Sequence, residues 1–384
     1  MKLLLLSPSP TRGGAEDYAL TVARGAIRAG WSVTAALPQA DGTRGLVDDF
    51  ERAGAATAAL PCVDSWGDGR PAGRGDVVRA TRATARLIRS VRPDVVHVTL
   101  PWPPFGAFCV LAPALAGVPS AVVFQLVPQE LEIGPARRVA YAAARRRRQT
   151  WVAVSENSRR TLARGFRCPV ETLQVIPNGA PRPAEGELDA ERPAARESVR
   201  DELGLEADTQ LVLSVGRLHP QKGHAELLEA AAPLMNGDAQ LVIAGDGPER
   251  ERLERMAADH GGVRLLGARD DVTRLLLAAD VFALPSRFEG FPFALVEAMA
   301  HGLPVVSSRF PGVEEALRDG RDGVVVDAGD AGELREAIRR LLDDGELAAR
   351  LSGSAYERAG ELTQDKMVER TLRLLSGTGR GGSR

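Results

Sequence analysis

The sequence is poor in the features that mark several protein classes. Aromatic residues make up only 4% of its 384 residues, and no apolar run approaches the length of a membrane-spanning helix. Lysines and arginines (49) nearly balance aspartates and glutamates (51), so the net charge of −2 gives no indication of nucleic-acid binding. Cys62, Cys109 and Cys168 lack disulfide or metal-ligand spacing. We therefore expect a cytoplasmic protein whose cysteines are small buried side chains.

What is present fits a globular chain of two domains. Hydrophobic residues at 44% and charged residues at 26% are ordinary values, and 384 residues suffice for a sizeable core. The opening MKLLLLSPSP has an apolar run of four residues that ends before Pro8, which is too short for a secretion signal. We expect it to form the first strand of a parallel sheet. The heavy use of alanine, arginine and glycine is typical of a GC-rich bacterial genome.

Strand-like and helix-like stretches alternate through both halves, which is the pattern of a doubly wound parallel sheet. Helical patterns over 17–29 and 77–91 fall between strands of the first half. The sequence therefore predicts an α/β protein with two Rossmann-like domains. The expected strands are 3–6, 32–37, 95–98, 121–124 and 151–154 in the first half, and 211–215, 240–244, 263–266, 281–284, 304–307 and 323–326 in the second.

Helix-breaking residues place the domain boundary after VIPNGAPRPAEGE, where a mixed-charge stretch follows. This predicts an N-terminal domain over 1–180, a linker over 181–199 and a C-terminal domain over 200–359. A further helix is expected over 365–375, where Met367, Val368 and Leu375 share one face. We expect a surface loop over 64–76 and disorder in the tail GTGRGGSR.

Two glutamates eight residues apart, Glu289 and Glu297 in SRFEGFPFALVEAMAHGLPVV, form the most informative motif. If helix holds across the pair, their carboxylates lie roughly 12 Å apart on related faces. That spacing fits the two ends of an extended ligand such as a nucleotide sugar. Residues 290–293 between them bring a helix N-terminus, which favours an anion. A solvated glutamate beside an ordinary helical glutamate explains the spacing equally well.

Two cations follow the expected strand 211–215: Arg217 and Lys222 in LVLSVGRLHPQKG. Open α/β sheets bind ligands beyond the carboxyl ends of their strands. Arginine offers a planar fork for phosphate oxygens and lysine a point charge. Together they would stabilise a departing nucleoside diphosphate. The alternative is a pair of solvated surface cations.

The motifs VIPNG, VGRLHPQKG, IAGDGPE and ADVFALPSRFEGFPFALVEAMAHGLPVV resemble those of the retaining glycosyltransferases of family four. PTRGGAE and PDVVHV match the family more loosely in the N-terminal half. The resemblance implies the GT-B fold, in which two Rossmann-like domains face a central cleft. It also implies a nucleotide-sugar donor, no bound metal or other cofactor, and a helix at about 360–376 that crosses back onto the N-terminal, acceptor-binding domain.

The resemblance also implies roles for individual residues. As catalytic residues, Arg217 and Lys222 would hold the departing diphosphate and Glu289 would contact sugar hydroxyls. Glu297 would bind the ribose. No enzymic nucleophile is implied, because the leaving phosphate assists the acceptor hydroxyl. The other implied donor-binding residues are Gly267, Ala268 and Arg269 near the base, Gly290, Phe291, Pro292, Phe293 and Ala294 near the sugar and phosphate, and Gly13 and Gly14 from the N-terminal domain.

One position departs from the family pattern. Many relatives have a histidine where this chain has Gln125, in VVFQLVPQE. Glutamine hydrogen-bonds but does not titrate, so assistance by the leaving phosphate is the expected mechanism. The tentative acceptor-binding residues are His97, Trp102, Gln125, Gln129 and Glu130. For His97 the plainer interpretation is a histidine with satisfied hydrogen bonds at the end of a strand. For Glu130 it is a solvated loop.

The most basic stretch is Arg145–Arg148, with Arg137 and Arg138 upstream. Some family members contact anionic membranes through a basic helix of this domain. Here alanines and arginines alternate without bulky apolar anchors, which favours a solvated face over membrane contact.

Several rival functions share this fold. A dinucleotide oxidoreductase is disfavoured because GDGPER has Arg250 where its third glycine belongs. A two-carboxylate hydrolase would need an acid opposite a base, which the binding roles of the glutamates do not require. A sugar-nucleotide epimerase and a non-catalytic nucleotide-sugar-binding protein stay open. We expect a retaining hexosyltransferase whose acceptor is a small soluble sugar, cyclitol or secondary metabolite. A lipid-linked or cell-surface polysaccharide precursor is the alternative acceptor.

Overall fold

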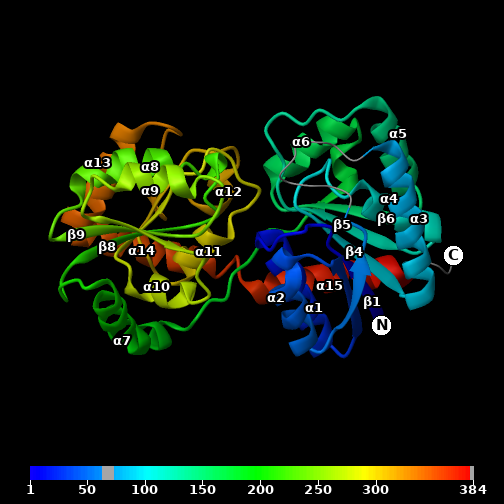
Figure 1. Ribbon diagram of the computed structural model, residues 1–384, viewed down its shortest axis with the longest axis horizontal. Helices are drawn as coiled ribbons and strands as arrows, with labels where there is room; N and C mark the ends of the chain where they lie inside the picture. Colours follow the sequence, from blue (N-terminus) through cyan, green and yellow to red (C-terminus); the bar gives the residue numbers. More distant parts are fainter. Residues whose placement is uncertain (63–72, 381–384) are drawn as a thin grey trace. The chain divides into compact units, whose positions relative to one another are not determined.

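The computed structural model describes residues 1–62 and 73–380, and the chain divides into two compact units. Unit 1 comprises Met1–Asn178 and Gln364–Arg384, and unit 2 comprises Gly179–Thr363. Each is a parallel sheet covered by helices, which confirms the predicted pair of Rossmann-like domains (Figure 1). Within the described ranges, no helix combines the length and apolarity needed to cross a bilayer.

The sheet of unit 1 has seven parallel strands in the order β3-β2-β1-β4-β5-β6-β7. The chain moves outward from β1 to β3 and then returns to the other side of β1, so the strand order reverses between β1 and β4. Ligands in such sheets bind at the carboxyl ends of the strands flanking this reversal. The strands are β1 Lys2–Leu6, β2 Ser32–Pro38, β3 Ala56–Leu60, β4 Val95–Leu100, β5 Ser120–Phe124, β6 Gln149–Ala153 and β7 Leu173–Val175.

Helices cover both faces of this sheet. Helix α1 packs against α15, which also contacts β4 and β5, whereas α4 packs against α3 and α5 on the opposite face (Figure 1). Burial on both faces explains why the central strands read as continuous apolar runs. The helices are α1 Gly14–Arg28, η1 Asp41–Thr43, α2 Arg44–Arg52, α3 Arg74–Val91, α4 Ala107–Ala116, α5 Pro135–Arg145, α6 Glu156–Phe166, η2 Val170–Thr172 and α15 Gln364–Arg380.

An aromatic cluster fixes α5 and α6 against the sheet of unit 1. The rings of Tyr141 and Phe166 stack with centroids 5.3 Å apart, and Trp151 meets Phe166 edge-on at 4.8 Å. The Trp151 indole N–H donates to Gln149 Oε1 at 2.8 Å, so its one polar atom is satisfied. The few aromatic residues of the chain thus order one flank of unit 1.

Helix α15 belongs to unit 1 although it follows unit 2 in the sequence. The hydroxyls of Tyr18 on α1 and Thr371 on α15 lie 3.3 Å apart. A Cβ on Gly25 would lie only 2.2 Å from Val368, so this glycine permits the close approach of the two helices. Met367 and Leu375 are buried there, on the apolar face that the sequence predicts.

Unit 2 repeats the plan with six parallel strands in the order β10-β9-β8-β11-β12-β13, which reverses between β8 and β11. The strands are β8 Gln210–Val215, β9 Ala239–Ala244, β10 Val263–Gly267, β11 Val281–Leu284, β12 Val305–Ser308 and β13 Val324–Val326. The helices are α7 Glu185–Leu203, η3 Pro220–Lys222, α8 His224–Ala231, η4 Ala232–Leu234, α9 Arg250–Ala257, α10 Val272–Ala278, α11 Phe293–Ala300, α12 Val313–Ala316, α13 Ala331–Asp343 and α14 Gly345–Ala359.

The predicted linker over 181–199 is wrong for most of its length, because helix α7 spans residues 185–203 within unit 2. Leu188 and Val199 are buried, and α7 packs against α10. Arg200 is only 2% exposed, and its Nη2 donates to Thr209 O at 2.6 Å and to Asp280 Oδ2 at 3.1 Å. The mixed charges that suggested a linker include the side chains that attach this helix to unit 2.

The structure also differs from several smaller predictions made from the sequence. Strands β3 and β7 were not predicted, because β3 is an alanine-rich edge strand and β7 has only three residues. Residues 64–72 of the expected loop and 381–384 of the expected disordered tail lie outside the described residues. The remaining parts of both predictions are largely helical, since α3 starts at Arg74 and α15 runs to Arg380. Cys109 is buried, but Cys62 is exposed, contrary to prediction.

Candidate active site

The strand reversal of unit 2 brings together two predicted catalytic residues. Lys222 follows β8 and Glu289 follows β11, and the Lys222 ammonium donates to Glu289 Oε1 at 2.5 Å. The Ser286 hydroxyl donates to the same oxygen at 2.7 Å. The Glu289 side chain is 7% exposed and that of Lys222 is 22% exposed. A largely buried carboxylate is therefore neutralised by an ammonium that solvent still reaches.

The backbone holds the two loops together. Gly223 has a φ of +67°, and a Cβ there would lie 2.1 Å from the carbonyl oxygen of Pro285. Only glycine permits this approach of the loop after β8 to the loop after β11. Gln221 strengthens the junction: its Nε2 donates to Phe288 O at 2.8 Å, and its carbonyl accepts from Arg287 N–H at 2.9 Å. Lys222 and Glu289 thus stand on a preorganised backbone.

His224 adds no positive charge to this junction near neutral pH. Its side chain is buried beside the loop after β8, and burial lowers its pKa to about 4, with the nearby Lys222 charge acting in the same direction. Lys222 and Arg217 therefore supply the positive charge of the loop that follows β8. Arg217 is exposed two residues past the end of the strand.

Helix α11 begins later than an unbroken helix across the two glutamates would require. Its first residue is Phe293 and its N-cap is Pro292, so Glu289 lies in the preceding loop and only Glu297 lies in the helix. The roughly 12 Å separation therefore does not apply, because it presumes regular helical rise. The first turn of α11 has no acidic residue and no side-chain cap at Pro292. Its N–H groups suit an anion near Glu289.

The predicted base-binding residues lie at the end of β10 in the same sheet. Gly267 is the last residue of the strand and Ala268 is exposed. The Arg269 guanidinium donates to Glu202 at 2.7 Å and to Asp271 at 2.8 Å, and its hydrogen bond to Asp271 holds the pKa of that carboxyl well below its ordinary value. Since the Arg269 side chain is committed to carboxylates of unit 2, any contact with a base falls to the main chain.

In unit 1, Gly13 and Gly14 open helix α1 beyond the end of β1, beside the reversal between β1 and β4. Both are exposed. Gly13 is extended, and a Cβ there would contact only Glu16 Oε2, at an ordinary 3.4 Å. No described residue of unit 1 requires glycine at position 13, which fits the prediction that a ligand approaches there. That role stays a prediction.

The acceptor candidates do not form one group. His97 lies within β4 with 0% exposure, its ring 5.7 Å from that of Tyr18, and burial lowers its pKa to about 3. It is a core residue, so the interpretation as an acceptor-binding residue is wrong for unit 1 as described. The physical reason is that β4 is a central strand whose two faces are both covered.

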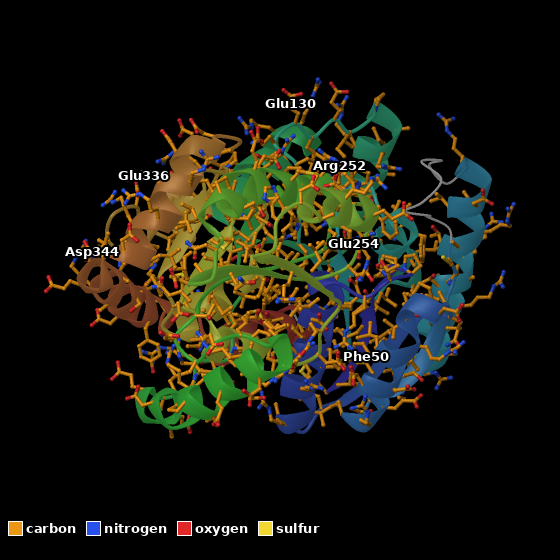
Figure 2. All side chains as sticks on the ribbon, turned by 60° about the vertical axis from the view of Figure 1, so that its left-hand side comes forward. Phe50, Glu130, Arg252, Glu254, Glu336 and Asp344 are labelled. Carbon is orange, nitrogen blue, oxygen red and sulfur yellow. The ribbon has the colours of Figure 1, made fainter. Side chains whose placement is uncertain are left out.

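The other candidates lie nearer the carboxyl edge. Gln125 follows β5 and is buried, and its Oε1 accepts from Asn178 Nδ2 at 3.0 Å. Trp102 is half-buried in the loop after β4. Gln129 and Glu130 are exposed farther along the loop after β5, and Figure 2 shows Glu130 at the outer margin of unit 1. Their acceptor roles stay predictions.

Family comparisons agree with this geometry. Residues 13–179 match the family described as glycosyl transferase 4-like domain, and residues 195–358 match glycosyl transferases group 1. The chain belongs to these glycosyl transferase families, and its two units have the GT-B fold. The resemblance to glycosyltransferases of family four inferred from its motifs is thereby confirmed.

Curated relatives of this glycosyltransferase are similar over part of their length. One is the lipopolysaccharide core biosynthesis glycosyltransferase LpsE of Rhizobium meliloti, 36% identical over 46% of this chain and 53% of the relative. A second is the alpha-D-kanosaminyltransferase of Streptomyces kanamyceticus, 36% identical over 44% and 45%. A third is the D-inositol 3-phosphate glycosyltransferase of Acidothermus cellulolyticus, 35% identical over 64% and 55%. The chain spans about half the length of these curated relatives.

Solved structures share the fold over nearly the whole glycosyltransferase. A glycosyltransferase from Rickettsia africae has a TM-score of 0.81 at 18% identity, with 99% of each chain covered. Anabaena HepE in complex with UDP has a TM-score of 0.76 at 22% identity, with 98% of this chain and 100% of that chain covered.

Sequence reasoning missed two residues that support the site in unit 2 and one buried carboxylate beside Gly13 in unit 1. Ser286 and Gln221 fall inside motifs already singled out, SRFEG and HPQKG, where a hydroxyl and an amide beside charged residues are the available signal. Glu16 lies in PTRGGAE, and its Oε1 accepts from Ser7 Oγ at 3.2 Å. Burial raises the pKa of Glu16 to about 8. A carboxylate three residues after the N-cap is a recognisable helix-start signal.

Proposed function

We propose that this glycosyltransferase moves a hexosyl group from a nucleoside-diphosphate sugar to an acceptor hydroxyl, with retention of anomeric configuration. The observation that carries the proposal is the Lys222–Glu289 pair at the strand reversal of unit 2. It sets a reachable cation and a hydrogen-bond acceptor side by side where such sheets bind nucleotides.

Donor binding exchanges partners within this pair. Lys222, with Arg217 on the same loop, takes up the diphosphate oxygens, and the N–H groups at the start of α11 add to their field. Glu289, released from Lys222 but still bonded to Ser286, then accepts hydrogen bonds from sugar hydroxyls. Glu297 binds the ribose, and the main chain of residues 267–269 contacts the base.

The transfer needs no enzymic base. The bond between the anomeric carbon and the diphosphate oxygen breaks, and its electron pair goes to the diphosphate. The acceptor oxygen bonds to the anomeric carbon on the same face, and its proton passes to an oxygen of the leaving phosphate. Gln125 does not titrate and His97 is buried and neutral, which supports assistance by the phosphate. Arg217 and Lys222 stabilise the charge that develops, so we propose a metal-independent reaction.

For the acceptor, we propose a small soluble sugar, cyclitol or secondary metabolite. The name of the Acidothermus relative, a D-inositol 3-phosphate glycosyltransferase, supports this class. The name of the Rhizobium relative, which acts in lipopolysaccharide core biosynthesis, supports a cell-surface precursor as the alternative.

The first test is thermal-shift screening with UDP, GDP, ADP, dTDP and their common sugar conjugates, with and without EDTA. A ligand that binds only the folded state raises the melting temperature by mass action. We expect one nucleotide series to raise it, and Lys222→Ala to abolish the shift. Arg287→Ala, which removes an exposed cation from the adjacent loop, serves as the matched control.

Turnover separates an enzyme from a binding protein on the same scaffold. With the donor identified, we expect release of the nucleoside diphosphate only when an acceptor is present, and NMR of the product should show the donor's anomeric configuration. Release without an acceptor would indicate an epimerase or hydrolase, and an inverted product would refute the proposed mechanism.

A further inference from the structure

A polar hollow of about 430 Å³ opens on unit 1, and its lining includes none of the residues assigned to the donor. It lies between α5, α6 and the loop that leads into α5. The side chains that matter here are those of Gln129, Glu132, Arg138, Thr161, Arg164 and Arg167.

Three arginines and one glutamate, Glu132, line this hollow. Arg138 is half-buried on α5, and Arg164 and Arg167 are exposed at the end of α6. Arg164 donates to the Thr161 hydroxyl at 3.2 Å. Within residues 1–62 and 73–380, Arg138 and Arg167 have neither a hydrogen bond nor an ion pair through their side chains. Two fork-shaped donors therefore stand in a concave site with their hydrogen-bonding capacity unused.

The start of α5 adds positive potential to the same wall. Gly134, which lines the hollow, is the N-cap of α5 and offers no side-chain cap, and the first turn has no acidic residue. The neighbouring helix α6 differs, since Ser155 caps it and Glu156 stands in its first turn. The positive end of the α5 dipole is thus left uncompensated beside the arginines.

The hollow has rigid walls. A Cβ on Gly165 of α6 would lie 2.9 Å from Leu131, so the loop packs directly on that helix. Tyr141 of α5 stacks on Phe166 of α6 at 5.3 Å, which fixes the two helices relative to each other. The arginines therefore project from a preformed frame, which lowers the entropy lost when they bind a ligand.

The charge of the whole unit favours the same kind of ligand. Unit 1 contains 28 lysines and arginines against 16 aspartates and glutamates, a formal charge of +12. Unit 2 contains 21 against 35, a formal charge of −14. The near-neutral total conceals this difference. An anion is attracted to unit 1 before it makes any specific contact.

We propose that the hollow between α5 and α6 binds a phosphate group through Arg138, Arg164 and Arg167, with the start of α5 as a fourth donor. Phosphate matches planar guanidinium forks and a helix N-terminus better than a single-charged group does. Two sources share this chemistry: a soluble phosphate ester and a phospholipid headgroup. The site does not depend on the donor residues of unit 2.

Calorimetric titration of the full chain with inorganic phosphate tests the site. All variants carry Arg217→Ala and Lys222→Ala, which remove the proposed donor cations, and ionic strength is held constant in a phosphate-free buffer. We expect Arg138→Ala with Arg167→Ala to weaken phosphate binding by about tenfold or more, since two charge-assisted contacts are lost. Arg82→Ala with Arg86→Ala removes the same charge from exposed positions on α3 and should change the affinity little.

A second variant guards against a folding artefact. Glu132→Gln removes the one negatively charged residue that lines the hollow, so phosphate should bind more tightly to this variant than to the parent. Equal affinities for both double arginine variants, or no gain with Glu132→Gln, would overturn the proposal.

Vesicle sedimentation distinguishes the two sources. It uses the same variants with phosphatidylcholine vesicles containing phosphatidylglycerol. Loss of both phosphate and vesicle binding in Arg138→Ala with Arg167→Ala would assign a lipid headgroup. Loss of phosphate binding alone would assign a soluble phosphate ester. Because the donor cations are absent throughout, failure of this proposal leaves the proposed glycosyl transfer untouched, and the converse holds as well.

Discussion

The two units share a fold but differ in their formal charge and in how their buried charged residues are paired. Unit 2, with a formal charge of −14, places its buried charges in pairs, as in Lys222 with Glu289 and Arg200 with Asp280. Unit 1, with a formal charge of +12, pairs its buried Asp49 with Arg12 but buries Glu16 without an ion pair among the described residues. Burial raises the pKa of Glu16, so unit 1 holds one carboxylate that favours the protonated form, whereas the buried Glu289 of unit 2 has a cation beside it.

This contrast teaches where each unit can hold an anion. The acidic unit 2 repels an anionic donor as a whole, so it needs fixed cations at close range, which Lys222 and Arg217 provide. The basic unit 1 attracts anions at long range and needs only an uncommitted cluster such as Arg138 and Arg167. Salt should therefore weaken anion binding to unit 1 more than nucleotide binding to unit 2.

The largest expected effect is on the paired site of unit 2. Lys222→Ala leaves Glu289 as a buried carboxylate without its cation and removes a contact to the leaving diphosphate. We expect the kcat of glycosyl transfer to fall by roughly 100-fold or more, as when a preorganised donor to developing charge is lost. Glu289→Ala should abolish transfer as well. Steady-state kinetics check both, with Arg287→Ala as control; full activity in Lys222→Ala would refute the diphosphate assignment.

The next effect concerns the stability of unit 2. Arg200→Ala leaves Asp280 without one of its two guanidiniums and leaves the carbonyl groups of Thr209 and Ala278 without that donor. Removing one partner of a buried pair destabilises by about 3–5 kcal/mol. Urea unfolding followed by circular dichroism should show the loss, because all four tryptophans of the sequence lie in unit 1 and their fluorescence does not report on unit 2. Arg196→Ala, at a more exposed position bonded to the same carboxylate, should have a smaller effect; equal effects would show that burial of Arg200 is not what matters.

The pH dependence of stability tests whether Glu16 of unit 1 is buried in its protonated form. The pKa of Glu16 is about 8 in the folded chain against an ordinary 4.5, so between these values the folded state keeps a proton that the unfolded state has lost. Glu16 therefore reduces stability progressively as pH rises from about 4.5 to 8, by at most about 1.4 kcal/mol per pH unit.

Glu16→Gln should remove that dependence. Melting temperatures of the two proteins at pH 5 and pH 8 check it, and His97, whose pKa is lowered, contributes equally to both proteins and cancels. If the variant and the parent lose stability in parallel between these pH values, Glu16 is already ionised in the folded state.

The smallest effect is expected at Gln125. Gln125→Ala removes a hydrogen bond with Asn178 and no titrating group, so we expect kcat/KM to fall by less than about tenfold. Gln125→Asn, which keeps the amide, is the control. A loss as large as that of Lys222→Ala would mean that Gln125 takes part in the chemistry.

The sequence predicts most strands because buried parallel strands are apolar runs bounded by turns, and Leu3–Leu6 and Val281–Leu284 show this plainly. It fails at β3, where alanines have no β-preference, and at α7, where charges that attach a helix to unit 2 look like those of a linker. Whether a histidine in a predicted strand is buried depends on where that strand lies in the sheet. His97 is in PDVVHV, and only the sheet order reveals that its strand is central.

For the site, the motif residues Lys222 and Glu289 could be found from the sequence, but their direct contact could not. It depends on the strand order β8-β11, which joins segments 67 residues apart, and on Gly223, whose missing Cβ allows the loops to meet. Ser286 and Gln221 complete the site through hydrogen bonds that no spacing rule indicates.

Helix α15 gives the chain an unusual order of assembly on the ribosome. Unit 1 is the first to be synthesised, yet its contacts of Tyr18 with Thr371 and of Gly25 with Val368 form only after residues 364–380 have been made. All of unit 2 is translated in the interval, so unit 2 can complete its core while the earlier unit still exposes the groove that α15 will fill. A released chain that ends at residue 363 should therefore hold a finished unit 2 and an unfinished unit 1, the reverse of their order in the gene.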